Sequence, residues 1–271
     1  MAAADAIEDL GVLDDEDAEA VRTYLLALAD DELVAAERYT EWQVRAPTLE
    51  SDIALSNIAQ DELGHARLWY DLVERFGDDE TDLIWERDPA DFRHSTLVEL
   101  PFEEGDWADA IVRHHLYDVA EDVRLHAIER SAVAPIRDRV GKVLDEEDYH
   151  LEHADSWLER LAADEEGHRR LQAALDRLFP YALTLFEPTA HEGTIDALGV
   201  RTESLAEMRE EWLTRVEGTL EGVGLEVPDA NPATPAGRDT DHTDHWPQLH
   251  DEMTETYREL GRDSATVIMD E

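Results

Sequence analysis

The sequence predicts an all-α protein, built on a four-helix bundle with additional helices toward the C-terminus. Apolar residues recur at helical spacing through most of the 271-residue chain, and no segment shows a convincing alternation typical of strands. A pattern of glutamate and histidine residues also occurs twice. Two helix pairs, each carrying one copy of that pattern, are the simplest arrangement that accounts for these observations.

Four long helices are expected in the first 161 residues. Ala46-Pro47-Thr48, Gly77-Asp78-Asp79 and Pro135 mark breaks between them. A polar connector of about residues 78–105 separates the two pairs, as a bundle made of two helix pairs requires. The predicted helices are residues 17–42, 49–76, 107–133 and 137–161.

Further helices are expected beyond the bundle. A fifth covers residues 166–179, with a continuation past Pro180 to Phe186 left open, and another covers 204–220. Residues 227–237 contain three prolines and predict an extended linker, followed by a helix over 248–260 and a free end over 264–271. The chain therefore divides into an acidic flexible lead-in, a helical domain, and a linker with a C-terminal helical tail: residues 1–16, 17–226 and 227–271.

The composition is strongly acidic. There are 68 Asp and Glu residues against 23 Lys and Arg, a net charge of −45, and Lys142 is the only lysine. Such a surface indicates a halophilic protein from a high-salt cytoplasm, where screening removes the self-repulsion. Direct nucleic-acid binding is disfavoured because no basic stripe is present to neutralise phosphates. A disordered acidic chain is disfavoured by the 42% of hydrophobic residues.

The chain is expected to be cytoplasmic. It contains no cysteine, so disulfides, thiolate metal sites and cysteine nucleophiles are excluded. The N-terminus lacks the basic and apolar regions of a secretory signal, and no apolar run reaches the length of a membrane span.

The repeated pattern predicts a dinuclear metal site. Glu37 precedes Glu62-Leu63-Gly64-His65, and Glu121 precedes Glu147-Asp148-Tyr149-His150. The two copies are offset by 84 residues at the lone glutamate and by 85 at the Glu-x-x-His motif. Two lone glutamates and two such motifs, each on its own helix, form the ligand set of di-iron or di-manganese carboxylate bundles. The predicted ligands are Glu37, Glu62, His65, Glu121, Glu147 and His150.

The motif alone carries little weight in so acidic a chain, and solvated carboxylates that happen to align remain the alternative. A third copy, Glu165-Glu166-Gly167-His168, lies beside a polar turn and is interpreted as accidental. Helical spacing places Glu62 and Glu147 on otherwise apolar faces, where a carboxylate is costly to bury unless it is paired or metal-bound. Glu121 is the weakest candidate, because Asp118 and Arg124 share its face.

Two other groups of histidines are weaker candidates for function. The run Asp241–His245 contains suitable metal ligands, but local runs of this kind are more often surface or interface elements. His114 and His115 are interpreted as structural histidines, with a hydrogen bond from His114 to a ligating carboxylate as an alternative. The aromatic residues nearby are interpreted as core packing.

Several segments carry a family resemblance. They are residues 37–42, 46–58 and 61–67, then 149–153, 171–178 and 240–245, with Leu249 and Met253. Together they resemble the C-subunit family of ring-1,2-phenylacetyl-CoA epoxidases, over about residues 25–260.

The resemblance implies a ferritin-like fold and a complex with a homologous A subunit that carries the working di-iron centre. It also implies an acyl-CoA substrate, other oxygenase components, and NADPH used only through a separate reductase. C subunits of this kind are regarded as structural partners whose own site has decayed, with Gln common at the position of Glu37. This chain departs from that pattern by retaining Glu37 and the other five candidate ligands.

Three functions remain open at this stage: a subunit of a di-iron monooxygenase, a non-catalytic scaffold for the A subunit, and a stand-alone ferritin-like iron or peroxide protein. The residues after the fifth helix favour a heteromeric complex over a storage shell. Iron and manganese are not distinguished, because both suit the same ligands. Arg38, Arg67 and Arg124 are available for coenzyme A phosphates, but nothing in the sequence singles them out.

Overall fold

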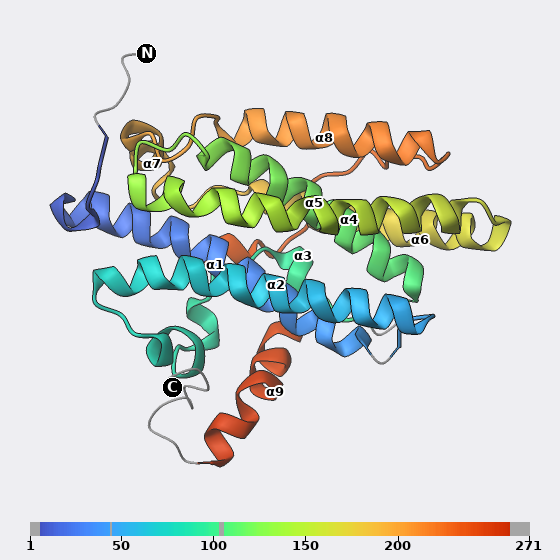
Figure 1. Ribbon diagram of the computed structural model, residues 1–271, viewed down its shortest axis with the longest axis horizontal. Coiled ribbons are helices and arrows are strands. Elements are labelled where there is room, and N and C mark those ends of the chain that lie inside the picture. Colours follow the sequence, from blue (N-terminus) through green and yellow to red (C-terminus); the bar gives the residue numbers. More distant parts are fainter. Residues whose placement is uncertain (1–5, 44, 103–105, 261–271) are drawn as a thin grey trace.

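Four long helices, arranged as two hairpins, form the centre of the computed structural model, which describes residues 6–43, 45–102 and 106–260 (Figure 1). Helices α1 and α2 form one hairpin and pack closely along each other, and α4 and α5 form the second. The bounds are Asp15–Gln43 for α1, Leu49–Val73 for α2, Trp107–Ile128 for α4 and Ala134–Ala162 for α5. The predicted all-α, ferritin-like class is confirmed, and the described residues form no strand.

Side chains and prolines fix where these helices begin. The hydroxyl of Thr48 accepts a hydrogen bond from the amide of Ser51 at the start of α2, and Asp106 accepts one from Ala108 at the start of α4. Pro135 lies in the first turn of α5, where its missing N–H costs nothing, so the helix begins three residues earlier than predicted. Helix α4 ends at Ile128, five residues before the predicted end, because residues 129–133 turn toward α5.

The connector between the hairpins contains short elements rather than a plain loop. The α2 hairpin arm ends in a 3₁₀ turn, and Gly77 follows with a φ of 107°, a conformation that glycine adopts without strain. The remaining elements are a π-helical turn at Thr81–Trp85, a 3₁₀ turn at Pro89–Asp91 and the one-turn helix α3 at Thr96–Glu99.

Outer helices cover the second hairpin. Helix α6 (Glu165–Ala182) passes through Pro180 and continues as a 3₁₀ turn to Phe186, the continuation that the sequence left open. Helix α8 (Leu205–Gly222) packs on α4, where the indole of Trp212 donates a hydrogen bond to the carbonyl of Leu116 (3.0 Å). Helix α7 (Glu192–Leu198) was not predicted, and α9 (His245–Glu259) projects below the bundle (Figure 1).

The described part of the acidic lead-in packs against the bundle. Leu10 is buried in a 3₁₀ turn at Leu10–Val12. The amide of Ile7 donates to the carbonyl of Ala132 (2.8 Å), and the amide of Ala134 donates to the carbonyl of Ile7 (2.9 Å). Residues 1–5 and the predicted free end at 264–271 lie outside the described residues.

Two aspartates in the middle of α1 hold the connector and the C-terminal segment. Asp30 accepts hydrogen bonds from the hydroxyl of Tyr70 (2.6 Å) and the amide of Arg93 (2.7 Å). Asp31 accepts from the amide of Ser95 (2.6 Å) and pairs with the guanidinium groups of Arg124 and Arg238. Both carboxylates are completely buried.

The charges around Asp31 favour its ionised form. Burial alone would raise the pKa of this carboxyl, but Arg238 and Arg124 outweigh that effect, and the pKa is lowered.

Among the described helices, none combines the length and hydropathy needed to cross a bilayer.

Arg238→Met is expected to lower the free energy of unfolding by about 3 kcal/mol or more, because Asp31 would keep a buried charge with half of its cationic partners removed. Urea denaturation at constant salt measures the change. Arg130→Met, at an exposed turn, is the matched control and should change stability by no more than about 0.5 kcal/mol. Equal midpoints for the two variants would contradict the role given to Arg238.

Candidate metal centre

Four glutamates and two histidines converge at the middle of the bundle. Their ligand atoms form two overlapping groups, each with all members within 4.8 Å of one another, and Glu62 belongs to both. One group contains Glu32, Glu62, His65 and Glu121, and the other contains Glu62, Glu147 and His150. Each of the four bundle helices contributes at least one of these residues. All six side chains are buried, with at most 1% of any residue exposed.

The Nδ1 atoms of both histidines face the carboxylates. Nδ1 of His65 lies 3.8 Å from Glu62 and 3.5 Å from Oε1 of Glu147. Nδ1 of His150 lies 3.1 Å from Oε1 of Glu147 and 3.8 Å from Oε1 of Glu62. The two Glu-x-x-His motifs therefore face each other across α2 and α5, as the shared helical face of residues three apart predicts.

The outer nitrogens of the histidines are held by carboxylates from the opposite helix. Nε2 of His65 lies 2.8 Å from Oε2 of Glu146, and Nε2 of His150 lies 3.4 Å from Oδ2 of Asp61. Each carboxylate comes from the residue just before the glutamate of a motif. A carboxylate at the outer nitrogen fixes the ring orientation and leaves the inner nitrogen free for a metal. Reasoning from sequence missed both residues, although their shared position before each motif was visible.

The structure corrects one predicted ligand. Glu37 belongs to neither group and is only half-buried, whereas Glu32, on the same helix, lies in one of them. Five residues turn an α-helix by about 500°, so Glu37 faces about 140° away from Glu32. Burial and the nearby Glu41 raise the pKa of Glu37.

The cause of the error is an extra turn in α1. Glu32 precedes Glu62 by 30 residues, whereas Glu121 precedes Glu147 by 26. Helix α1 continues eleven residues past Glu32, and α4 only seven past Glu121, so the four additional residues make about one turn. Equal spacing of the two copies was therefore the wrong criterion. A usable signal was the acidic run Asp30-Asp31-Glu32 inside an otherwise apolar stretch of the helix.

Glu121, the weakest candidate in the sequence, lies in the group. Arg124 pairs with Asp31, and Asp118 lies 2.6 Å from Nε2 of His114. The alternative that His114 binds a ligating carboxylate is thus not what the structure shows, since Asp118 belongs to neither group. Burial lowers the pKa of His114 to about 3 and raises that of Asp118 to about 7.

The buried charges at this centre are not balanced within the described residues. Both oxygens of Glu62, Glu121 and Glu147 and the inner nitrogens of His65 and His150 lack a hydrogen-bond partner there. Burial raises the pKa values of Glu32, Glu62 and Glu121 well above the ordinary 4.5. Burial would lower the pKa of His150, but Glu147 and Asp61 raise it to about 12.

These unpartnered carboxylate oxygens and imidazole nitrogens fit the ligand set of a pair of divalent cations. Four carboxylates and two imidazoles provide hard oxygen and nitrogen ligands, and their combined negative charge matches what two such ions would neutralise. In the absence of metal, the same residues would have to share protons to remain buried.

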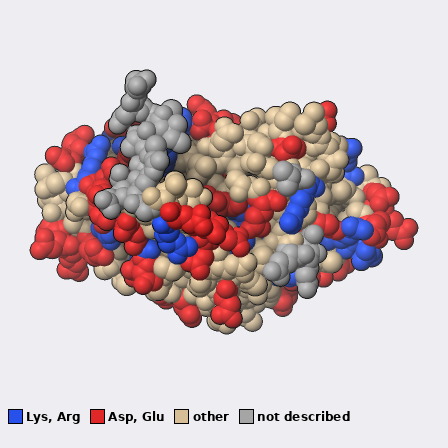
Figure 2. Space-filling model, turned by 90° about the horizontal axis from the view of Figure 1, so that it is seen from below, with Lys and Arg blue, Asp and Glu red and all other residues tan. Residues whose placement is uncertain are grey.

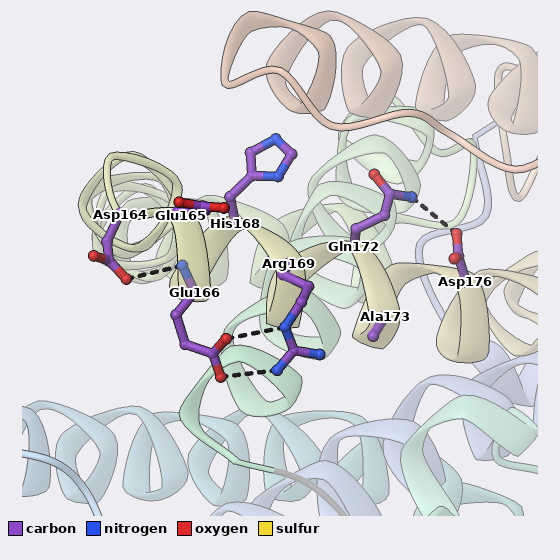
Figure 3. Close-up of a pocket in the computed structure, with 8 residues that line it drawn as sticks. All are labelled: Asp164, Glu165, Glu166, His168, Arg169, Gln172, Ala173 and Asp176. Carbon is purple, nitrogen blue, oxygen red and sulfur yellow. Dashed lines mark hydrogen bonds and ion pairs between the residues drawn. The ribbon is translucent and has the colours of Figure 1, made fainter.

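The third Glu-x-x-His copy lies apart from this centre. It opens α6 and lines a surface hollow of about 780 Å³, where Glu166, inside the motif, pairs with Arg169 (Figure 3). Nε2 of His168 donates to the carbonyl of Gly224 (2.9 Å). Glu165 and His168 do not belong to any of the described groups of potential metal ligands.

Fold and site together define the class of protein: a ferritin-like helical bundle with a buried cluster of four glutamates and two histidines that could hold metal at its core. Comparison with known proteins gives the family. The profile of the phenylacetic acid catabolic protein family matches residues 1–263, and the chain belongs to that family.

Two relatives from Escherichia coli (strain K12) illustrate the similarity, and both are components of 1,2-phenylacetyl-CoA epoxidase. The chain is 32% identical to the C subunit of that enzyme over 245 residues, covering 88% of this chain and 96% of the relative. It is 27% identical to the A subunit over 206 residues, covering 74% of this chain and 66% of the relative. The resemblance found in the sequence is confirmed.

Glu32→Gln is expected to reduce the metal content of the purified protein by at least half, because it removes a carboxylate from the centre. Glu37→Gln makes the same chemical change on the same helix, outside both groups, and should retain the wild-type content. Elemental analysis of both proteins after loading with Fe²⁺ or Mn²⁺ provides the measurement. Metal loss in the Glu37 variant alone would restore the ligand set predicted from the repeat.

Metal binding is expected to stabilise the protein more at about pH 8 than at about pH 5.5, because bound ligands must lose their protons. The folded-state pKa values of Glu32, Glu62 and Glu121 are raised above 4.5. In the metal-free protein, the stability that their protonation contributes is therefore fully present below pH 4.5. It is lost as the pH rises through the pKa values of the folded state.

His150 changes stability with the same sign. Its contribution to the stability of the folded state is fully present below pH 6.5 and is lost as the pH rises toward its folded pKa of about 12. His65, whose pKa burial lowers, acts with the opposite sign. Thermal unfolding with and without Mn²⁺ at the two pH values measures the increment. The Glu62→Gln variant should show a smaller increment at both, and a wild-type increment independent of pH would oppose the ligand assignment.

Proposed function

We propose that this chain is a subunit of a multicomponent monooxygenase that epoxidises the aromatic ring of phenylacetyl-CoA in aerobic phenylacetate breakdown, and that it carries a di-iron centre of its own. Membership of the phenylacetic acid catabolic protein family supports the first part. The single observation that carries the second part is the buried set of four glutamates and two histidines with unpartnered inner atoms.

The reaction adds one oxygen atom of O₂ to the ring and releases the other as water, using two electrons and two protons. A bound iron pair supplies the redox chemistry that this requires. Glu32, Glu62, Glu121 and Glu147 would hold the cations together with His65 and His150. Asp61 and Glu146 orient the two imidazoles from outside. The closed packing around the ligands, with Trp69 and Ile58 completely buried, excludes bulk water.

The electrons and the coenzyme A contacts are assigned to other components of the complex. NADPH would act through a separate reductase. Arg38 and Arg124, two of the arginines considered for coenzyme A phosphates, are buried and bonded to the carbonyl of Glu99 and to Asp31, respectively. Arg67 is exposed and lies 3.4 Å from Glu80. These engagements favour substrate binding at or beyond the interface with the homologous A subunit.

The acidic surface supports function in a high-salt cytoplasm. Acidic side chains cover more of the face seen in Figure 2 than basic ones, which form scattered patches among them. At molar salt the Debye length falls to about 3 Å, so these like charges are screened from one another. This environment fits the excess of acidic residues and the single lysine, Lys142.

The experiment places wild-type or variant chain in a complex whose A-type subunit is unchanged. The variant Glu62→Gln/Glu147→Gln removes one carboxylate from each motif, and Glu37→Gln is the matched control. We expect about two metals per wild-type chain, none in the double variant, and at least a tenfold loss of ring oxygenation by the complex that contains it.

Copurification with the A-type partner and circular dichroism are measured on the same samples. A double variant that assembles and supports full oxygenation would reduce the chain to a scaffold. A wild-type chain that forms homomeric shells and ignores the A-type partner would contradict membership of the complex itself and favour a storage role.

A further inference from the structure

A second group of ligand atoms lies between the connector and the C-terminal segment, outside the dinuclear centre. It consists of His94, Glu99 at the end of α3, and His242 before α9, with their ligand atoms within 4.8 Å of one another. His94 and Glu99 are completely buried, and 6% of the His242 side chain is exposed. We propose that these three residues form a mononuclear zinc-type site that fastens the C-terminal segment to the bundle.

The ring nitrogens of His242 face two acceptors. Nε2 lies 2.9 Å from the carbonyl of Phe92, and Nδ1 lies 2.8 Å from Oε2 of Glu99. A neutral imidazole has only one N–H. If that proton is on Nε2 and donated to Phe92, the lone pair of Nδ1 faces a carboxylate and needs a cation between them.

The contact with Phe92 matches the environment of metal-bound histidines. A ligating histidine commonly donates its other ring N–H to a backbone carbonyl or a carboxylate, which fixes its tautomer. Glu99 is held in the same manner, since its Oε1 accepts a hydrogen bond from the amide of Thr243 (2.7 Å), which leaves Oε2 directed at the two histidines. Both ligands are thus positioned by contacts outside the site.

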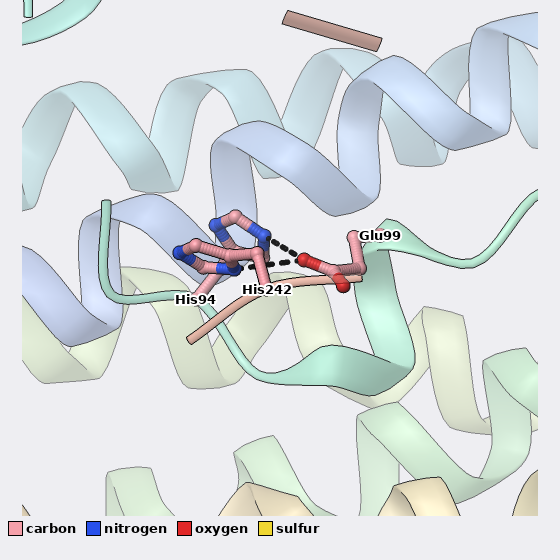
Figure 4. A group of neighbouring side chains, drawn as sticks. All are labelled: His94, Glu99 and His242. Atoms are coloured by element: carbon pink, nitrogen blue, oxygen red, sulfur yellow. Dashed lines mark hydrogen bonds and ion pairs between the residues drawn. The ribbon is translucent and has the colours of Figure 1, made fainter. Parts of the chain in front are cut away.

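His94 completes a set of two imidazoles and one carboxylate. Its Nε2 lies 2.7 Å from the same Oε2 of Glu99. The rings of His94 and His242 lie one over the other, with centroids 4.3 Å apart and planes inclined by 22° (Figure 4). Stacking in this way is unfavourable if both rings are protonated, because the like charges repel. A shared cation allows both rings to remain neutral.

The dimensions of the site are compatible with zinc. Zinc binds histidine nitrogen and carboxylate oxygen at about 2.0–2.1 Å in tetrahedral geometry, which places neighbouring ligand atoms about 3.3 Å apart. The present separations of 2.7 and 2.8 Å would widen by about half an ångström, and the two stacked rings would turn so that both nitrogens point at the ion. Two imidazoles and one carboxylate leave a fourth position for water, as in other three-ligand zinc sites.

The backbone of the C-terminal segment passes very close to the connector at Gly237. A Cβ at Gly237 would lie 2.1 Å from the carbonyl of His94 and 3.2 Å from the ring of His242, so only glycine fits there. The amide of Gly237 donates to the hydroxyl of Thr96, and the neighbouring Arg238 reaches Asp31. The proposed ion would join two segments about 140 residues apart at a point where the chain already makes close contact.

The test uses the full-length Glu62→Gln/Glu147→Gln protein, in which the dinuclear centre is disabled, so that its outcome is independent of the function proposed above. After removal of metal with a chelator, the protein is titrated with Zn²⁺, and with Co²⁺ as a spectroscopic probe. We expect one equivalent of zinc, the visible absorption of tetrahedral Co²⁺, and a higher Tm with zinc present.

Adding His94→Gln or His242→Gln should weaken zinc binding at least tenfold and abolish the Tm shift. Adding His245→Gln, on the same segment but outside the group, should leave both unchanged. If these variants do not fold, X-ray absorption of the Co²⁺-loaded parent decides, with two imidazoles and one carboxylate expected. A folded parent that takes up no zinc, or takes it up through other ligands, would overturn the proposal and leave the site held by a proton on His242.

Discussion

Three consecutive acidic residues in the middle of α1 are the point on which the rest of the molecule depends. Asp30 accepts hydrogen bonds from the amide of Arg93 in the connector and from the hydroxyl of Tyr70 in α2. Asp31 receives Ser95, Arg124 from α4 and Arg238 from the C-terminal segment. Glu32, the third, faces the buried cluster of glutamates and histidines. One helical turn therefore connects both hairpins, the connector, the tail and the site.

This arrangement is costly in electrostatic terms. Taking an ion from water into a protein interior costs several kcal/mol, and pairing it with another buried charge often only offsets that cost. What the buried pairs contribute is alignment, since each guanidinium must meet its carboxylate in one geometry. The centre follows the same logic, because its carboxylates are tolerated in the core only with cations or protons between them.

Much of the fold and most of the centre could be predicted from local patterns. The apolar spacing of the four long helices survives in the structure, and the two Glu-x-x-His motifs face each other because residues three apart share a helical face. Glu32 was missed because the repeat was assumed to keep equal spacing, while the lengths of α1 and α4 are set by tertiary contacts at their ends. The partners Asp61 and Glu146, and the meeting of His94 with His242, depend on how distant segments pack, which periodicity does not encode.

The early end of α4 has a consequence for how the chain completes its fold. Helix α1 has one more turn past Glu32 than α4 has past Glu121. At the end of α4, backbone hydrogen bonds instead join segments from both sides of the sequence. Ile7 bonds to Ala132 and Ala134, Gly199 bonds to Ala132, and Thr202 bonds to Ala127. The turn between α4 and α5 is thus hydrogen-bonded to a segment from the start of the chain and to residues some 70 positions later. Contacts of such different sequence separation form at different times. The end of the second hairpin can therefore be completed only after the chain beyond α7 has been made.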